Sequence, residues 1–379
     1  MVNEVECLRY FSARQAAITL FNSNVRWRKL SDVKRKLKDF LYKEKKLPTL
    51  MVVQIDSIIE QILREVQRWY NKHLKIFPDN IKTNPSGTRR LFHPSEHLRL
   101  FYPRIVWKER IIEIDDYKTA IEIINKECQN WTLMEFQFAA CYNMIDVIEN
   151  KRKYDKIRLR TLQQQLSDHP IYDFWITILQ DSKMWGVFFN REARLIRQKV
   201  SLLLHFAITN GFIEIVKYIW PKLSPAHQEQ VGFLCWKKLC FRAEHPNIVR
   251  FLCEKLCHIN SVSLARLTWD CFYEKIYKAT LDKDEQSLPD REENYNKLLM
   301  LLQNWCPRLR QAMLARENYR AISDMFRYRR QEELELFTEY LNRSQLTEAI
   351  KVVDKIYEKK RSASNSNLRE IVIRRQATV

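Results

Sequence analysis

An all-α fold is predicted for this chain of 379 residues, in the form of a helical-repeat solenoid with flanking helical extensions. Three observations favour it. The chain holds only four glycines and is rich in Leu, Lys, Glu and Arg, which are good helix formers. Apolar residues recur at i, i+3, i+4 and i+7 rather than at alternate positions. A segment that begins near Leu202 returns, with changes, 33 positions later, the length of one stacked helix-turn-helix unit.

Residues 1–76 are expected to form an N-terminal helical region, in which Pro48 separates two apolar stripes at helical spacing. The stripes consist of Val33, Leu37, Phe40 and Leu41, and of Ile55, Ile58, Ile59, Ile62, Leu63 and Val66. Residues 77–104 carry four prolines and a glycine, so we expect a Pro-rich irregular linker there. Asp115 and Asp116 then start a helix, because acidic groups favour the positive end of a helix dipole.

Residues 105–307 are expected to hold divergent repeats. Ile215-Val216-Lys217 corresponds to Ile248-Val249-Arg250, and Trp236 lies 33 positions before Trp269. An earlier copy lies 68 positions upstream, where 136–140 matches 204–208 and 145–148 matches 213–216. A more divergent unit is expected at about 171–189, and a later one follows a polar insert at 281–294. Each unit needs neighbours to bury its apolar face.

The segment 204–217 resembles the ankyrin repeat. Leu204-His205-Phe206-Ala207-Ile208 corresponds to the family's Thr-Pro-Leu-His-x-Ala pattern, and 210–217 corresponds to its Asn-Gly-His turn and Leu-Glu-Val-Val-Lys run. The resemblance implies that His205 forms hydrogen bonds between repeats rather than doing chemistry. Gly211 is expected to supply the positive φ that ends the first helix. The repeat-motif residues, all structural, are His205, Ala207, Asn210, Gly211, Ile215, Val216, Ile248 and Val249.

The unit at 201–225 departs from the ankyrin pattern in two places. Ser201-Leu202 stands where the family has Thr-Pro, and the segment 221–225 stands where the family has Gly-Ala-Asp. We therefore expect the family's helix pairs rather than its β-hairpin fingers. After the repeats, residues 308–361 are expected to form a C-terminal helical cap with a polar outer face. Residues 362–379, rich in Ser, Asn and Arg, are expected to form a flexible basic tail.

The formal net charge of +19 indicates either an acidic partner, such as nucleic acid or anionic lipid, or helix faces that keep the chain solvated. Basic residues gather at 26–46, at 151–160, at 308–330 and from Lys359 onward. Acidic residues are interleaved through most of the chain, which favours the solvated faces. Aromatic and basic residues alternate in 326–330, a mixture that nucleic-acid modules use, although no recognised nucleic-acid motif accompanies it.

The sequence predicts neither an enzyme nor a cofactor site. Four isolated glycines cannot form the Gly-rich loops that hold dinucleotides or nucleotide phosphates. Cys253 and Cys257 with His258, together with Cys235 and Cys240, are the only group resembling metal ligands. Their spacing matches no usual zinc pattern, so we expect buried thiols on apolar helix faces and no metal.

Nine cysteines, an odd number, and a beginning without an apolar signal segment favour a reducing intracellular compartment, with the cytoplasm preferred over the nucleus. No charge-free stretch reaches the length of a membrane span.

The function predicted from these patterns is a non-catalytic protein–protein interaction scaffold, and the alternative is a basic nucleic-acid-binding protein. The protein partner and the oligomeric state stay open. Trp236 and Trp269, which share a repeat position, are interpreted as core or groove-wall residues. The alternative for both is an aromatic anchor for a partner.

Overall fold

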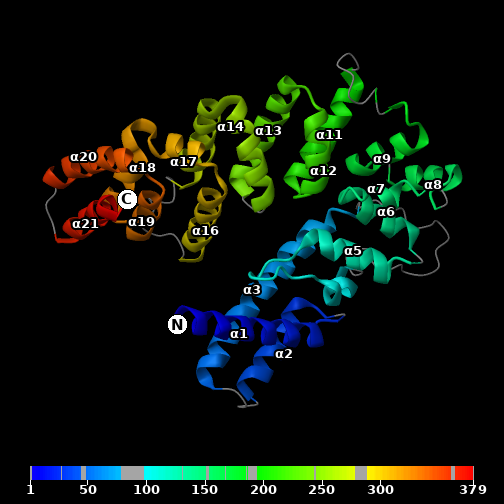
Figure 1. Ribbon diagram of the computed structural model, residues 1–379, viewed down its shortest axis with the longest axis horizontal. Helices are drawn as coiled ribbons and strands as arrows, with labels where there is room; N and C mark the ends of the chain where they lie inside the picture. Colours follow the sequence, from blue (N-terminus) through cyan, green and yellow to red (C-terminus); the bar gives the residue numbers. More distant parts are fainter. Residues whose placement is uncertain are drawn as a thin grey trace. The chain divides into compact units, whose positions relative to one another are not determined.

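The computed structural model describes residues 2–26, 28–43, 48–77, 98–129, 131–150, 153–166, 168–184, 186, 194–242, 245–277, 288–359 and 363–378. Over these residues the structure is helical and has no β-strand, apart from an isolated bridge between Trp107 and Ile114 (Figure 1). The predicted all-α class is confirmed. The chain divides into two compact units, Met1–Ile219 and Trp220–Val379, so the expected repeat region 105–307 is shared between them.

In the first unit, α1 and α2 pack on the long helix α3. The two predicted apolar stripes are buried in α2 and α3, except for Phe40, which is 42% exposed. The burial of each of these aliphatic side chains adds about 1.5–3 kcal/mol to the free energy of unfolding. The described helices of this unit are α1 (Val2–Asn24), α2 (Leu30–Lys43), α3 (Thr49–Leu74), the 3-10 helix η1 (Arg99–Arg104), α5 (Asp116–Glu127), α6 (Thr132–Cys141), α7 (Ile145–Ile148), α8 (Lys156–Leu166), α9 (Pro170–Gln180), α11 (Arg194–Thr209) and α12 (Ile213–Ile219).

The second unit is a succession of helices in which α14 packs against α13, α16 and α17, and α20 packs against α18 and α21. Its core includes fully buried aromatic side chains, Trp236, Trp269 and Tyr273 among them. The described helices are the 3-10 helix η2 (Trp220–Lys222), α13 (Pro225–Arg242), α14 (Pro246–Thr268), the π-helix η3 (Trp269–Tyr277), α16 (Leu288–Asn304), α17 (Pro307–Leu314), α18 (Arg316–Arg327), α19 (Gln331–Glu339), α20 (Arg343–Lys359) and α21 (Ala363–Thr378).

Three helix pairs share one turn geometry: α6 with α7, α11 with α12, and α18 with α19. In each turn one residue has a positive φ, namely Asn143 (55°), Gly211 (79°) and Arg329 (54°). The next amide N–H reaches back to a carbonyl in the last turn of the first helix, as in a Schellman cap. These bonds join Met144 to Ala139 (2.8 Å), Phe212 to Ala207 (2.9 Å) and Arg330 to Met325 (2.9 Å). The positive φ expected at Gly211 is confirmed, and the third pair lies beyond the predicted repeat region.

The ends of some expected segments differ from the structure. Residues 363–378 form helix α21 instead of a flexible tail, because Leu368 and Val372, spaced i and i+4, are buried against neighbouring helices. At the end of the expected linker, Phe101 and Tyr102 are buried in η1, whereas 78–97 lie outside the described residues. The expected insert 281–294 is helical from Leu288, and 281–287 lie outside the described residues. In the expected divergent unit, 171–180 belong to α9, and 187–189 lie outside the described residues.

Gly232 lies at a close contact between α13 and α14, and we expect Gly232→Ala to lower the free energy of unfolding by about 1–3 kcal/mol. A Cβ there would lie 2.5 Å from Leu256 Cδ2 and 3.0 Å from Trp220 Cη2, and both side chains are buried. In a helix with free space around the glycine, replacing it by alanine would instead stabilise the helix by about 1 kcal/mol. Gly186→Ala is the control, because its Cβ would meet nothing within 4 Å. Urea unfolding of both variants checks this, and equal stability would contradict the tight contact.

Candidate functional site

A cavity of about 840 Å³ in the second unit has five basic side chains among the residues that line it. Helix α18 and the turn after it supply Arg320, Arg327 and Arg329, and α20 supplies Lys355 and Lys359. We call these five residues the basic cluster. The fold thus joins the basic segment 308–330 to α20, where the last predicted basic segment begins. Glu317 is the one acidic side chain among the lining residues.

Two local features place the basic cluster. Lys355 and Lys359 are spaced i and i+4, so they share one face of α20, and α20 packs against α18. Arg329 occupies the left-handed position that ends α18, with φ of 54°. Glycine is the residue that adopts this conformation without steric cost, and an arginine there is disfavoured. Arg329 therefore does not stabilise the backbone conformation of this turn, whereas its side chain contributes a guanidinium to the cavity lining.

The start of α18 is also left-handed. Glu317, Asn318 and Tyr319 have φ values of 49°, 54° and 58°. Left-handed residues other than glycine cost roughly 1–2 kcal/mol each, so the rest of the structure must hold this turn in place. Glu317 and Asn318 line the cavity. Backbone strain of this kind concentrates at binding sites and switch regions, which makes the cavity the strongest site candidate among the described residues.

The charges of the basic cluster are only partly compensated. Arg320 pairs with Glu317 (2.6 Å), and Arg320 and Arg327 each lie 3.7 Å from the buried Asp324. Asp324 also accepts a hydrogen bond from the Tyr273 hydroxyl (2.9 Å). Among the described residues, no carboxylate lies within ion-pair distance of Arg329, Lys355 or Lys359. The cavity therefore has uncompensated cationic donors in its lining that suit a phosphate or carboxylate group.

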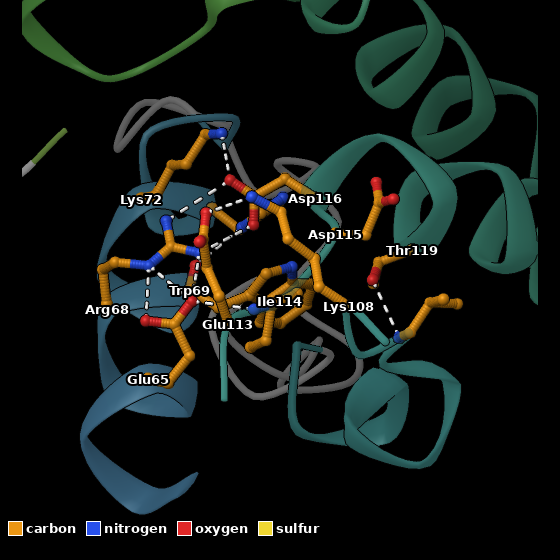
Figure 2. A network of polar contacts seen from close by, with 12 residues as sticks. Glu65, Arg68, Trp69, Lys72, Lys108, Glu113, Ile114, Asp115, Asp116 and Thr119 are labelled. Atoms are coloured by element: carbon orange, nitrogen blue, oxygen red, sulfur yellow. Dashed lines mark hydrogen bonds and ion pairs between the residues drawn. The ribbon is translucent and has the colours of Figure 1, made fainter. Parts of the chain in front are cut away.

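A second polar group, buried in the first unit, joins α3 to the start of α5 (Figure 2). Asp116 accepts from Lys72 Nζ (2.5 Å) and from Arg68 Nη2 (2.9 Å), and Arg68 also pairs with Glu65 (2.8 Å). We call these four residues the Asp116 network. Glu65 accepts a further bond from the Ile114 backbone N–H (2.9 Å), so the network also fixes the segment before α5.

The surroundings of the Asp116 network shift several pKa values. Burial would raise the pKa of Asp116, but the charges of Lys72 and Arg68 outweigh it and hold that pKa well below its usual range. Burial lowers the pKa of Lys72, and Asp116 only partly offsets this. Burial also lowers the pKa of His73 to about 3, so its ring is neutral. His73 donates from Nδ1 to the Trp69 carbonyl (2.6 Å) and accepts at Nε2 from the Tyr142 hydroxyl (2.7 Å).

Each charged group of the Asp116 network has an opposite charge within hydrogen-bond distance, and Lys72 also lies over the Tyr142 ring. Its side chain is 3% exposed and that of Asp116 is 18% exposed. A paired, largely enclosed group of this kind holds elements together, and it leaves little room for a substrate. The predicted helix start is confirmed next to it, since the Asp115 side chain accepts from the Lys118 N–H (3.0 Å).

The repeat-motif residues pack as parts of helices and turns. Ala207, Ile215, Val216, Ile248 and Val249 are buried. The Asn210 side chain donates to the Phe206 carbonyl (2.8 Å) and so helps to close the end of α11 next to Gly211. His205 is half-buried and has interaction partners, and its hydrogen bond between repeats stays a prediction.

Trp236 and Trp269, which were considered as partner anchors, are residues that are 0% and 1% exposed. Trp236 Nε1 donates to Thr268 Oγ1 (2.9 Å), and Trp269 stacks on Tyr273 with ring centroids 4.2 Å apart. Both rings thus pack in the core of the second unit and present no surface to a partner in this conformation.

The cysteines singled out in the sequence are brought together only in part. Cys253 and Cys257 lie on α14 with their Sγ atoms close to that of Cys306, which precedes α17. Cys235 is buried in α13 and His258 is exposed, and neither belongs to this group. The side chain of Cys240 lies outside the described residues. Cys306 was not selected from the sequence, because it lies 49 positions after Cys257.

Lys355 was also not singled out, and the pairing of Lys72 with Asp116 was not predicted. The spacing of Lys351, Lys355 and Lys359 at i, i+4 and i+8 is a signal that could have indicated a basic face on α20. Lys72 follows Arg68 by one helical turn, but nothing in the sequence indicates that Asp116 faces both.

None of the described helices is both long and apolar enough to span a bilayer. Comparison with protein-family models, with curated proteins and with solved structures finds no match to this chain.

Proposed function

We propose that this chain is a non-catalytic interaction protein in which divergent ankyrin-like helix pairs, stacked as a solenoid, support a binding site for an acidic protein partner. The three helix pairs with one turn geometry support the repeat architecture, and two of them are 68 positions apart, as the sequence alignment expects. A reducing intracellular compartment belongs to the same proposal, and the seven cysteines whose side chains are described are free thiols.

The observation that carries the proposal is the basic cavity. Arg329, Lys355 and Lys359 line it without a carboxylate partner among the described residues, and Arg329 occupies a position where glycine would fit the backbone better. Positive charges that line one cavity repel one another, so an acidic side chain or a phosphorylated residue of a partner would relieve that repulsion. Charges of this kind also speed the encounter with an acidic surface.

Nucleic acid is a second candidate partner, which one specific observation favours. Tyr328 is 41% exposed and lines the cavity between Arg327 and Arg329. An exposed aromatic ring flanked by cations can stack on a base while the cations hold the adjacent phosphates.

The test compares two triple variants of the full chain with the same change in net charge. Arg329→Gly, Lys355→Gln and Lys359→Gln together remove the uncompensated cations, and glycine suits the φ at position 329. Lys156→Gln, Arg160→Gln and Lys237→Gln together are the control, because these exposed residues do not line the cavity. Capture from lysate, with and without nuclease, is measured for both variants and for the unchanged chain.

A partner that survives nuclease, is kept by the control and is lost by the cavity variant supports the protein-binding proposal. Recovery that requires intact RNA or DNA supports the second candidate instead. In that case, log K for binding a single strand should fall less steeply with log salt in the cavity variant. The magnitude of the slope should decrease by about 2, for three lost phosphate contacts. If the cavity variant and the control retain every partner equally, the cavity is not the binding site.

A further inference from the structure

Three thiols meet where α14 packs against the start of α17. Cys253 and Cys257, spaced i and i+4, share one buried face of α14, and Cys306 is the N-cap residue of α17. All three Sγ atoms lie within 4.8 Å of one another, and those of Cys257 and Cys306 are 2.9 Å apart. We propose that this thiol cluster binds a soft divalent cation, with Zn²⁺ as the physiological member of that class.

The spacing of the sulfur atoms suits such an ion. Zinc binds thiolates at about 2.3 Å in a tetrahedron, which places two sulfur atoms about 3.8 Å apart. The Cys257 and Cys306 Sγ atoms, 2.9 Å apart, lie closer than this value, and all three Sγ atoms lie within 4.8 Å of one another, so small side-chain rotations would reach it. The three residues come from two helices that pack tightly together, and the ion would therefore join elements that are already in place.

Two positively polarised groups lie beside the sulfur atoms. The backbone N–H of Cys306 donates to Cys253 Sγ (3.0 Å), a bond of the kind that orients and supports a metal ligand. Helix α17 begins next to the cluster, and its first turn carries Arg308, which adds a positive charge there. Each thiol that binds the ion releases its proton to solvent, so uptake is accompanied by proton release.

The fourth position of the tetrahedron is open to solvent or to an external ligand. Cys306 is only partly buried, so the cluster can be reached from outside. No other described His, Cys, Asp or Glu has a ligand atom in the group. Three protein ligands with one exchangeable position is an arrangement that zinc adopts in proteins.

The experiment uses Co²⁺ as a spectroscopic probe of the full chain, kept reduced and free of oxygen. The unchanged chain should develop a sulfur-to-cobalt charge-transfer band in the near ultraviolet, which Zn²⁺ then abolishes by displacing the probe. Cys306→Ser should weaken binding by more than the about 10- to 100-fold that the loss of a supporting partner causes. Serine is a preferred N-cap residue, so this variant should retain the fold of α17.

Cys235→Ser is the matched control, because Cys235 is a buried free thiol of the same unit that lies outside the thiol cluster. It should bind Co²⁺ as the unchanged chain does. Thermal unfolding gives a second readout: excess Zn²⁺ should raise the Tm of the unchanged chain and of Cys235→Ser but not that of Cys306→Ser. The proposal is overturned if the unchanged chain shows no charge-transfer band, or if Cys306→Ser binds Co²⁺ as tightly as Cys235→Ser does.

Discussion

Replacing Asp116 by asparagine should lower the free energy of unfolding of the first unit by about 3–5 kcal/mol. Asp116 is the shared partner of Lys72 and Arg68, and the Lys72 side chain is 3% exposed. An asparagine would keep the shape of the carboxylate but would leave the enclosed Lys72 ammonium without a counter-charge, and Arg68 would keep only Glu65 as its partner. The loss of one partner of a buried pair is far more costly than the net contribution of the pair itself.

Asp115→Asn is the control for this prediction, because it makes the same replacement of a carboxylate by a carboxamide at the adjacent residue. Asp115 caps α5, and asparagine caps a helix about as well as aspartate, so its effect should be below about 0.5 kcal/mol. Urea unfolding, with hydrogen exchange of α3 amides to report on the first unit, measures both variants. Equal stability of the two variants would show that the Asp116 network contributes little. Lys72→Met combined with Asp116→Leu should recover much of the loss, since it removes both charges of the Lys72–Asp116 pair and leaves Arg68 paired with Glu65.

The stability of the first unit should fall steeply below pH 6.5. Burial lowers the pKa of His73 to about 3 and the pKa of His169 to about 4. Between these values and the ordinary pKa of histidine near 6.5, the unfolded chain binds protons that the folded chain does not. Each group therefore removes about 1.4 kcal/mol of stability per pH unit as the pH falls, and above pH 6.5 neither contributes a loss. Two groups predict a loss of about 3 kcal/mol between pH 6.5 and pH 5, because at pH 6.5 each unfolded histidine is only half protonated.

His73→Gln isolates one of the two groups. Glutamine can still donate to the Trp69 carbonyl and accept from the Tyr142 hydroxyl, but it does not titrate. We expect the dependence of stability on pH to be about half as steep in this variant between pH 6.5 and pH 5, measured by urea unfolding at several pH values. Parallel pH profiles for the variant and the unchanged chain would mean that His73 takes up its proton in the folded state. Below about pH 4, protonation of Asp116 should add a further loss, because its folded pKa lies under its unfolded value.

Local features of this protein could be predicted from the sequence. The apolar stripes in 33–41 and 55–66 correspond to buried faces of α2 and α3, with Phe40 as the exception. The positive φ of Gly211 and the start of α5 at Asp115 were also predicted, and both are found. Each of these features depends on residues within about one or two helical turns, where spacing and backbone sterics dominate. The helix formed by 363–378 was missed because its two buried residues are set among polar ones.

The candidate sites could not be predicted in the same way. Lys72 meets Asp116 across 44 positions, and Cys306 meets Cys257 across 49. The cavity joins Arg329 to Lys355 and Lys359 only because α18 packs on α20. The sequence by itself determined the helices, their apolar faces and the overall positive charge. The tertiary structure decided which charges are compensated and which thiols meet, because helical periodicity specifies a buried face but not the helix that covers it.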